Sequence, residues 1–167
     1  MKIMIGCDHG GYDLKQIVVK HLQQLDHQVE DIGASSGEAV DYPAYAVQVA
    51  HAVAEARVDR GILICGSGIG MCITANRIPG VRAAVVSEPY AAKLSRRHND
   101  SNILCLGGRL LGDQLALEIV DVWLREEFEG GRHERRVALV DRLTADPGVK
   151  TARTRPWELL HLGPQCW

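Results

Sequence analysis

Five short apolar segments alternate with longer segments of helical character, and this alternation limits the possible fold more than any other feature of the chain. The expected strands cover residues 2–6, 28–32, 61–65, 83–86 and 102–106, and the expected helices cover residues 12–25, 43–56, 69–77, 89–97 and 113–127. Apolar strands that alternate with helices are typical of a parallel sheet covered on both faces. The sequence therefore predicts an α/β fold, a three-layer doubly wound (Rossmann-like) five-stranded parallel sheet with helices on both faces.

The rest of the chain sets the expected domain organisation. A charged segment at residues 132–136 runs into residues 137–143 and predicts one more amphipathic helix. We expect one domain over residues 1–143 and a tail at residues 144–167 that is loosely ordered or packed on a neighbouring subunit. The net charge is −2 and no run has the form of a transmembrane helix or a signal peptide. We therefore expect a cytoplasmic protein with no nucleic-acid or membrane partner.

The five cysteines and seven histidines show no spacing that is typical of a metal site. The cysteines form no C-x-x-C pair, so we expect free thiols in a reducing compartment. The sequence therefore predicts no bound metal.

The third expected strand ends in Cys65 and continues into the glycine-rich loop Gly66-Ser67-Gly68-Ile69-Gly70. Glycines let a backbone turn its N–H groups toward an anion, and a helix terminus favours thiolate over thiol. The glycine spacing matches neither a dinucleotide fingerprint nor a P-loop. We interpret Cys65 as a candidate base or nucleophile beside a cradle for negative oxygen. The alternative is an inert buried cysteine.

A second glycine-rich loop, which carries Asp8 and His9, is expected at the same edge of the sheet. In an open parallel sheet, ligands bind beyond the carboxyl ends of the strands, where strand order reverses. If the first strand lies beside both the second and the third, this loop meets the loop after Cys65. The alternatives are a helix N-cap for Asp8, a surface turn for His9, and an N-cap role for Ser67 that is compatible with ligand binding.

Three arginines are candidate phosphate ligands. Arg132 and Arg136 are four residues apart, so they share one helix face, and two guanidinium groups there suit a phosphate. Arg109 lies just beyond the fifth strand. The alternatives are a solvated charged face for the first two and a solvent-facing loop position for Arg109.

His98 and Asn99 end the helix before the fifth strand, which puts them at the amino edge of the sheet, opposite Cys65. If His98 works with Cys65, it comes from a second subunit. We therefore predict a homodimer with composite sites across a two-fold axis, and the sequence leaves a tetramer open. Without that pairing, His98 is a histidine at a helix C-terminus, where the dipole stabilises it.

Several pieces of the chain form a highly specific combination. In order they are Gly6-Cys7-Asp8-His9, Asp41-Tyr42-Pro43, Cys65 through Gly70, Ala75-Asn76, Ser87-Glu88-Pro89-Tyr90, Arg97-His98-Asn99-Asp100 and Gly130-Gly131-Arg132-His133-Glu134-Arg135-Arg136. In this combination the chain resembles the ribose-5-phosphate isomerase B family, within a wider group that includes galactose-6-phosphate isomerase subunits. Met71 stands where some members carry a glutamate base, so the chain resembles the cysteine type, and Ser67 replaces a frequent threonine.

The resemblance implies an enzyme of the pentose phosphate pathway that interconverts D-ribose 5-phosphate and D-ribulose 5-phosphate without a metal or other cofactor. It implies Cys65 as the base that moves a proton between C2 and C1 through an enediolate, with the Ser67 hydroxyl beside it. It implies that His98 assists opening of the furanose ring. The substrate-binding residues that it implies are Asp8, His9, Tyr42, Gly66, Ser67, Gly68, Ile69, Gly70, Asn99, Arg109, Arg132 and Arg136.

Two other functions stay open at this point. One is isomerisation of a six-carbon sugar phosphate, such as allose or galactose 6-phosphate, which depends on the length of the pocket. The other is a non-catalytic sugar-phosphate-binding protein, which we would expect to lose the base and keep the arginines, whereas this chain has both.

Overall fold

Five parallel strands form one sheet in the order β2-β1-β3-β5-β4 in the computed structural model, which describes residues 1–144. The strands are β1 (Lys2–Cys7), β2 (Gln28–Asp31), β3 (Arg60–Cys65), β4 (Ala83–Val85) and β5 (Ile103–Gly107). Because β1 lies between β2 and β3, strand order reverses between β1 and β3, as the sequence interpretation required. The crevice at the carboxyl ends of these two strands is therefore the expected ligand site.

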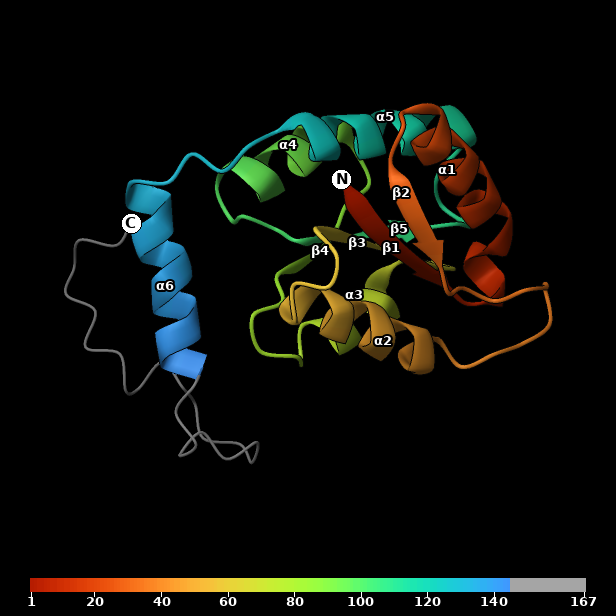
Figure 1. Cartoon of the computed structure of the whole chain (residues 1–167), viewed down its shortest axis with the longest axis horizontal. Coiled ribbons are helices and arrows are strands. Elements are labelled where there is room, and N and C mark those ends of the chain that lie inside the picture. The colour runs from red at the N-terminus through yellow and green to blue at the C-terminus, as the bar shows by residue number, and fades with distance from the viewer. Residues whose placement is uncertain (145–167) are drawn as a thin grey trace.

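Helices cover both faces of the sheet (Figure 1). One face carries α1 (Tyr12–Gln24), α4 (Pro89–Arg97) and α5 (Asp113–Arg125), and the other carries α2 (Tyr42–Ala54) and α3 (Ile69–Ala75). A short 3-10 helix, η1 (His9–Gly11), precedes α1. The three-layer, doubly wound α/β prediction is confirmed.

Each layer of helices has its own apolar core because successive side chains of a strand point to opposite faces. In β3, Ile62 and Ile64 pack in the core that contains α1 and α5. Leu63 and Cys65 pack in the core that contains α2 and α3. The sulfur of Cys65 therefore lies on the α2/α3 side, where the glycine-rich loop passes into α3.

We expect Trp123→Ala to lower the free energy of unfolding by about 3–5 kcal/mol. Trp123 is fully buried, and its indole Nε1 donates a hydrogen bond to Ser101 Oγ at 2.8 Å. The substitution leaves a large cavity and removes one hydrogen bond of the Ser101 hydroxyl, which still donates to Ser95 Oγ at 2.9 Å. Urea unfolding followed by circular dichroism measures the loss, and Leu25→Ala, at a side chain that is 45% exposed, is the control. A loss below about 1 kcal/mol in Trp123→Ala would contradict the assignment of Trp123 to the core.

The last described helix, α6 (Arg132–Thr144), confirms the predicted amphipathic helix. It stands apart from the three layers, on the side away from the arrowheads of β1 and β2 (Figure 1). His133 in its first turn is its buried residue, whereas Leu139, Val140 and Leu143 are exposed. Beyond Thr144 the predicted tail lies outside the described residues. No helix within residues 1–144 has the length and apolar character needed to cross a bilayer.

Candidate active site

The loops that follow β1 and β3 lie side by side at the carboxyl edge of the sheet. The Asp8 amide donates a hydrogen bond to the Ile64 carbonyl at 3.2 Å, which joins the two strand ends. The loops approach so closely that a Cβ atom on Gly10 would lie 2.9 Å from the Gly66 nitrogen. The structure thus brings together the two glycine-rich loops that the sequence singled out.

Cys65 is the last residue of β3 and is 5% exposed. Its Sγ accepts a hydrogen bond from the Gly68 amide at 3.1 Å, which fixes the sulfur against the loop. Gly68 has a left-handed backbone (φ 77°), and a Cβ atom there would lie 2.9 Å from a Val85 methyl group. Glycine is therefore required for the amide to reach the sulfur.

The same loop presents free backbone donors. Within residues 1–144, the amides of Ser67 and Gly70 have no hydrogen-bond acceptor. The Ser67 hydroxyl accepts a hydrogen bond from the Ile69 amide at 3.4 Å, but the N-cap of α3 is Gly68, so the N-cap alternative for Ser67 is wrong. α3 has only seven residues, so we expect direct donation by these amides to matter more for an anion than the dipole of this short helix.

Asp8, His9 and Tyr42 surround the loop pair. Asp8 is buried, and one of its carboxylate oxygens, Oδ1, accepts from the amides of Gly10 and Gly11 at 2.8 and 3.2 Å, which makes it the N-cap of η1. His9 Nδ1 accepts from the Val40 amide at 3.3 Å. The capping alternative for Asp8 is thus correct, and its second oxygen, Oδ2, remains available.

Two larger side chains lie against the glycines of the loop. The ring of Tyr42, the first residue of α2, lies 2.8 Å from the position of a Cβ atom on Gly70. The Arg109 side chain lies 3.4 Å from the corresponding position on Gly66, and the Arg109 amide donates to the Gly66 carbonyl at 3.1 Å. Both residues thus belong to the carboxyl-edge group together with Ile69, which is exposed beside them.

The other predicted residues lie at the amino edge. His98 is the C-cap of α4, and Asn99 and Asp100 lead from it toward β5. Asp100 has a left-handed backbone (φ 48°), and its carboxylate accepts from Arg82 at 2.6 Å and from Arg96 at 2.8 Å. These ion pairs hold the turn that carries His98. The five residues of β5, at about 3.3 Å each, separate this turn from the edge that holds Cys65.

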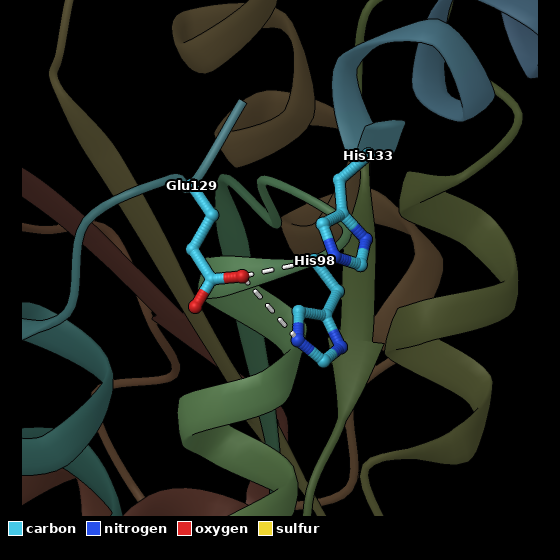
Figure 2. Close-up of side chains that lie close together, drawn as sticks. All are labelled: His98, Glu129 and His133. Atoms are coloured by element: carbon cyan, nitrogen blue, oxygen red, sulfur yellow. Dashed lines mark ion pairs between the residues drawn. The ribbon is translucent and has the colours of Figure 1, made fainter. Parts of the chain in front are cut away.

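A second group therefore forms around the start of α6, where Glu129 and His133 join His98 (Figure 2). The His98 and His133 rings are stacked, with centroids 4.1 Å apart and planes within 3°. The Oε2 atom of Glu129 lies 3.7 Å from Nε2 of each histidine. Sequence reasoning assigned no role to Glu129 or His133. Their i, i+4 spacing and the position of His133 beside Arg132 were the available signals.

The three ligand atoms of His98, Glu129 and His133 lie within 4.8 Å of one another, so we tested whether they suit a metal ion. A ring nitrogen binds a metal along a direction in its own ring plane. The two planes are parallel, so the two directions do not converge on one ion. The arrangement of these three residues does not suit a metal centre.

The cysteine thiols outside the Cys65 loop differ in pKa. Burial raises the pKa of Cys7 to about 11, and burial also raises that of Cys105 well above its usual value. A hydrogen bond with Cys105 lowers the pKa of Cys72, on α3, to about 7. All four cysteines within the described residues are free thiols.

Comparison with known proteins identifies the family of this chain. Residues 3–140 match the Ribose/Galactose Isomerase family, and this chain belongs to that family. Ribose-5-phosphate isomerase B of Escherichia coli is 54% identical over 139 residues, which cover 83% of this chain and 93% of that protein.

Solved structures extend the comparison to three dimensions. The ribose-5-phosphate isomerase B of Clostridium thermocellum superposes with a TM-score of 0.85 at 51% identity, over 86% of this chain and 97% of that one. The Mycoplasma genitalium enzyme, solved with bound ribulose-5-phosphate, gives a TM-score of 0.83 at 42% identity, over 86% and 95% of the two chains.

Proposed function

We propose that this chain is an aldose–ketose isomerase that interconverts D-ribose 5-phosphate and D-ribulose 5-phosphate. The observation that carries the proposal is the position of the Cys65 sulfur, 3.1 Å from the Gly68 nitrogen and beside the free amides of Ser67 and Gly70. The proposal is also supported by relatives and structural neighbours that are named ribose-5-phosphate isomerase B. The match with this chain covers nearly the whole length of each of them.

The proposed reaction begins from the open-chain sugar. Cys65, as thiolate, removes the proton from C2 of the aldose, and the electron pair forms an enediolate whose charge rests on O1. The Ser67 and Gly70 amides donate to that oxygen, a contribution that typically amounts to several kcal/mol in the transition state. Cys65 then returns the proton to C1, and the proton of the C2 hydroxyl moves to O1, which completes the ketose.

Substrate binding uses the remaining predicted residues. Asp8, His9, Tyr42 and Arg109 line the carboxyl edge around Cys65. Arg132 and Arg136 bind the phosphate, which fixes a flexible open chain so that C1 and C2 lie at the sulfur. His98, with Asn99, assists opening of the furanose ring.

These two groups lie at opposite edges of one protomer, so we propose a homodimer in which each site combines the carboxyl edge of one protomer with the amino edge of its partner. Two surfaces support this proposal. The first is an exposed apolar patch around the Cys65 loop, formed by Ile69, Ile73, Val85 and Leu110. The second is the exposed apolar face of α6 with Leu139, Val140 and Leu143, which finds no cover in the described part of its own protomer. A second copy of the chain covers both surfaces at once.

The test is direct conversion of ribose 5-phosphate to ribulose 5-phosphate by the purified protein, in buffer that contains EDTA. We expect turnover that the chelator does not reduce, because the proposed chemistry uses only protein groups. Allose 6-phosphate and galactose 6-phosphate, assayed in parallel, rank six-carbon substrates against the pentose. No turnover with ribose 5-phosphate, or loss of turnover on chelation, would contradict the proposal.

A further inference from the structure

His133 occupies an unusual position in α6. The helix is exposed along most of its length, yet His133 in its first turn is only 6% exposed. Its ring lies flat on the ring of His98 (Figure 2). The residue before it is Arg132, whose Nε lies 3.2 Å from His133 Nε2.

The contact with Arg132 determines the protonation of His133. A guanidinium group has only hydrogen-bond donors and stays charged. Arg132 Nε therefore donates, and His133 Nε2 accepts, so the ring is neutral and carries its proton on Nδ1. The surroundings agree: burial lowers the pKa of His133, and the neighbouring His98, Arg132 and Arg136 lower it further against the opposing effect of Glu129.

A neutral His133 leaves the Glu129 charge for His98. The Oε2 atom of Glu129 lies 3.7 Å from each Nε2, beyond hydrogen-bond length, and His133 Nε2 is already engaged by Arg132. Glu129 is itself held in place, since its amide donates to the Arg97 carbonyl at 3.0 Å and its carboxylate pairs with Arg97. The Glu129 carboxylate is thus available to His98, the ring on which His133 stacks.

We propose that His133 is a positioning residue, held neutral, that orients His98 by stacking and Arg132 by accepting its Nε–H. The proposal rests on the function proposed above, in which His98 assists ring opening and Arg132 binds phosphate. His133 touches neither reacting carbon. It sets the geometry of two substrate-directed side chains from a single buried position.

Three variants separate the two contacts. His133→Gln keeps an acceptor for Arg132 and removes the stacked ring, His133→Phe keeps a ring and removes the acceptor, and His133→Ala removes both. Kinetics in the two reaction directions supply the readout. Ribose 5-phosphate enters as a closed furanose, whereas ribulose 5-phosphate cannot form that ring because its O5 carries the phosphate.

We expect His133→Gln to lower kcat from ribose 5-phosphate about 10-fold, with a smaller effect from ribulose 5-phosphate and little change in KM. We expect His133→Phe to raise KM about 10-fold or more in both directions with kcat nearly unchanged, because Arg132 loses its acceptor. His133→Ala should combine both effects. If all three variants change kcat and KM alike, or leave both unchanged, His133 has no positioning role.

A measurement on the unmodified protein tests the inference separately from the function. Nitrogen-15 NMR of the histidine side chains at neutral pH should show His133 neutral with its proton on Nδ1. A proton on Nε2, or a charged ring, would overturn the inference even in a fully active enzyme. Absence of ribose 5-phosphate turnover in the same preparation would instead overturn the proposed function.

Discussion

Cys65→Ala is expected to lower the rate of isomerisation by about 10²–10⁴-fold, the contribution that a positioned proton-transfer group typically makes. The methyl side chain cannot accept the C2 proton. The loop amides and the arginines remain, so the variant should still bind ribose 5-phosphate. Coupled assays measure turnover, calorimetry measures binding, and proton NMR in heavy water follows exchange at C2.

Cys7→Ala is the matched control. Cys7 is also a buried cysteine at the carboxyl end of a strand, but burial raises its pKa to about 11, so it holds no thiolate near neutral pH. We expect this variant to keep its activity. The role of Cys65 as the base would be contradicted if turnover in Cys65→Ala stayed within about tenfold of the unmodified protein. It would also be contradicted if proton exchange at C2 were as fast in this variant as in the unmodified protein.

The second large effect is restoration of activity in a mixed dimer. A protomer with Cys65→Ala lacks the proposed base, and a protomer with both Arg132→Ala and Arg136→Ala lacks the phosphate ligands. Each homodimer should be nearly inactive, the second because the loss of two charge-assisted contacts lowers kcat/KM by about 10²–10⁴-fold. In the heterodimer, one site pairs the intact carboxyl edge of one protomer with the intact amino edge of the other. That heterodimer should have about half the activity of the unmodified dimer.

Co-expression with two different tags and two successive affinity steps isolates the heterodimer. The control is a doubly tagged dimer in which both protomers carry Cys65→Ala, and it should stay inactive. If each site formed within one protomer, the heterodimer would contain no intact site and would also be inactive. Failure to recover any doubly tagged species would contradict the dimer itself.

The fold was predictable because its elements are encoded locally. The run from Ile62 to Cys65 is too short and too apolar for a surface helix, and the glycines after it stop the strand. The same reasoning recovered the edge location of His98, since a helix that leads into a parallel strand must end at the amino side. The expected meeting of the two glycine-rich loops depended on the first strand lying beside both the second and the third. The structure shows this arrangement, because β1 pairs with both β2 and β3.

The sequence by itself determined the secondary structure, the two glycine-rich loops and the candidate residues at both edges of the sheet. Tertiary structure alone decided that the amide of Gly68 reaches the sulfur of Cys65, and that Glu129 and His133 gather around His98. The physical reason is range. Strand and helix signals arise from neighbouring residues in the chain, whereas a hydrogen bond to a sulfur or the stacking of two rings from different helices depends on how the packed layers fix distances to within a few tenths of an ångström.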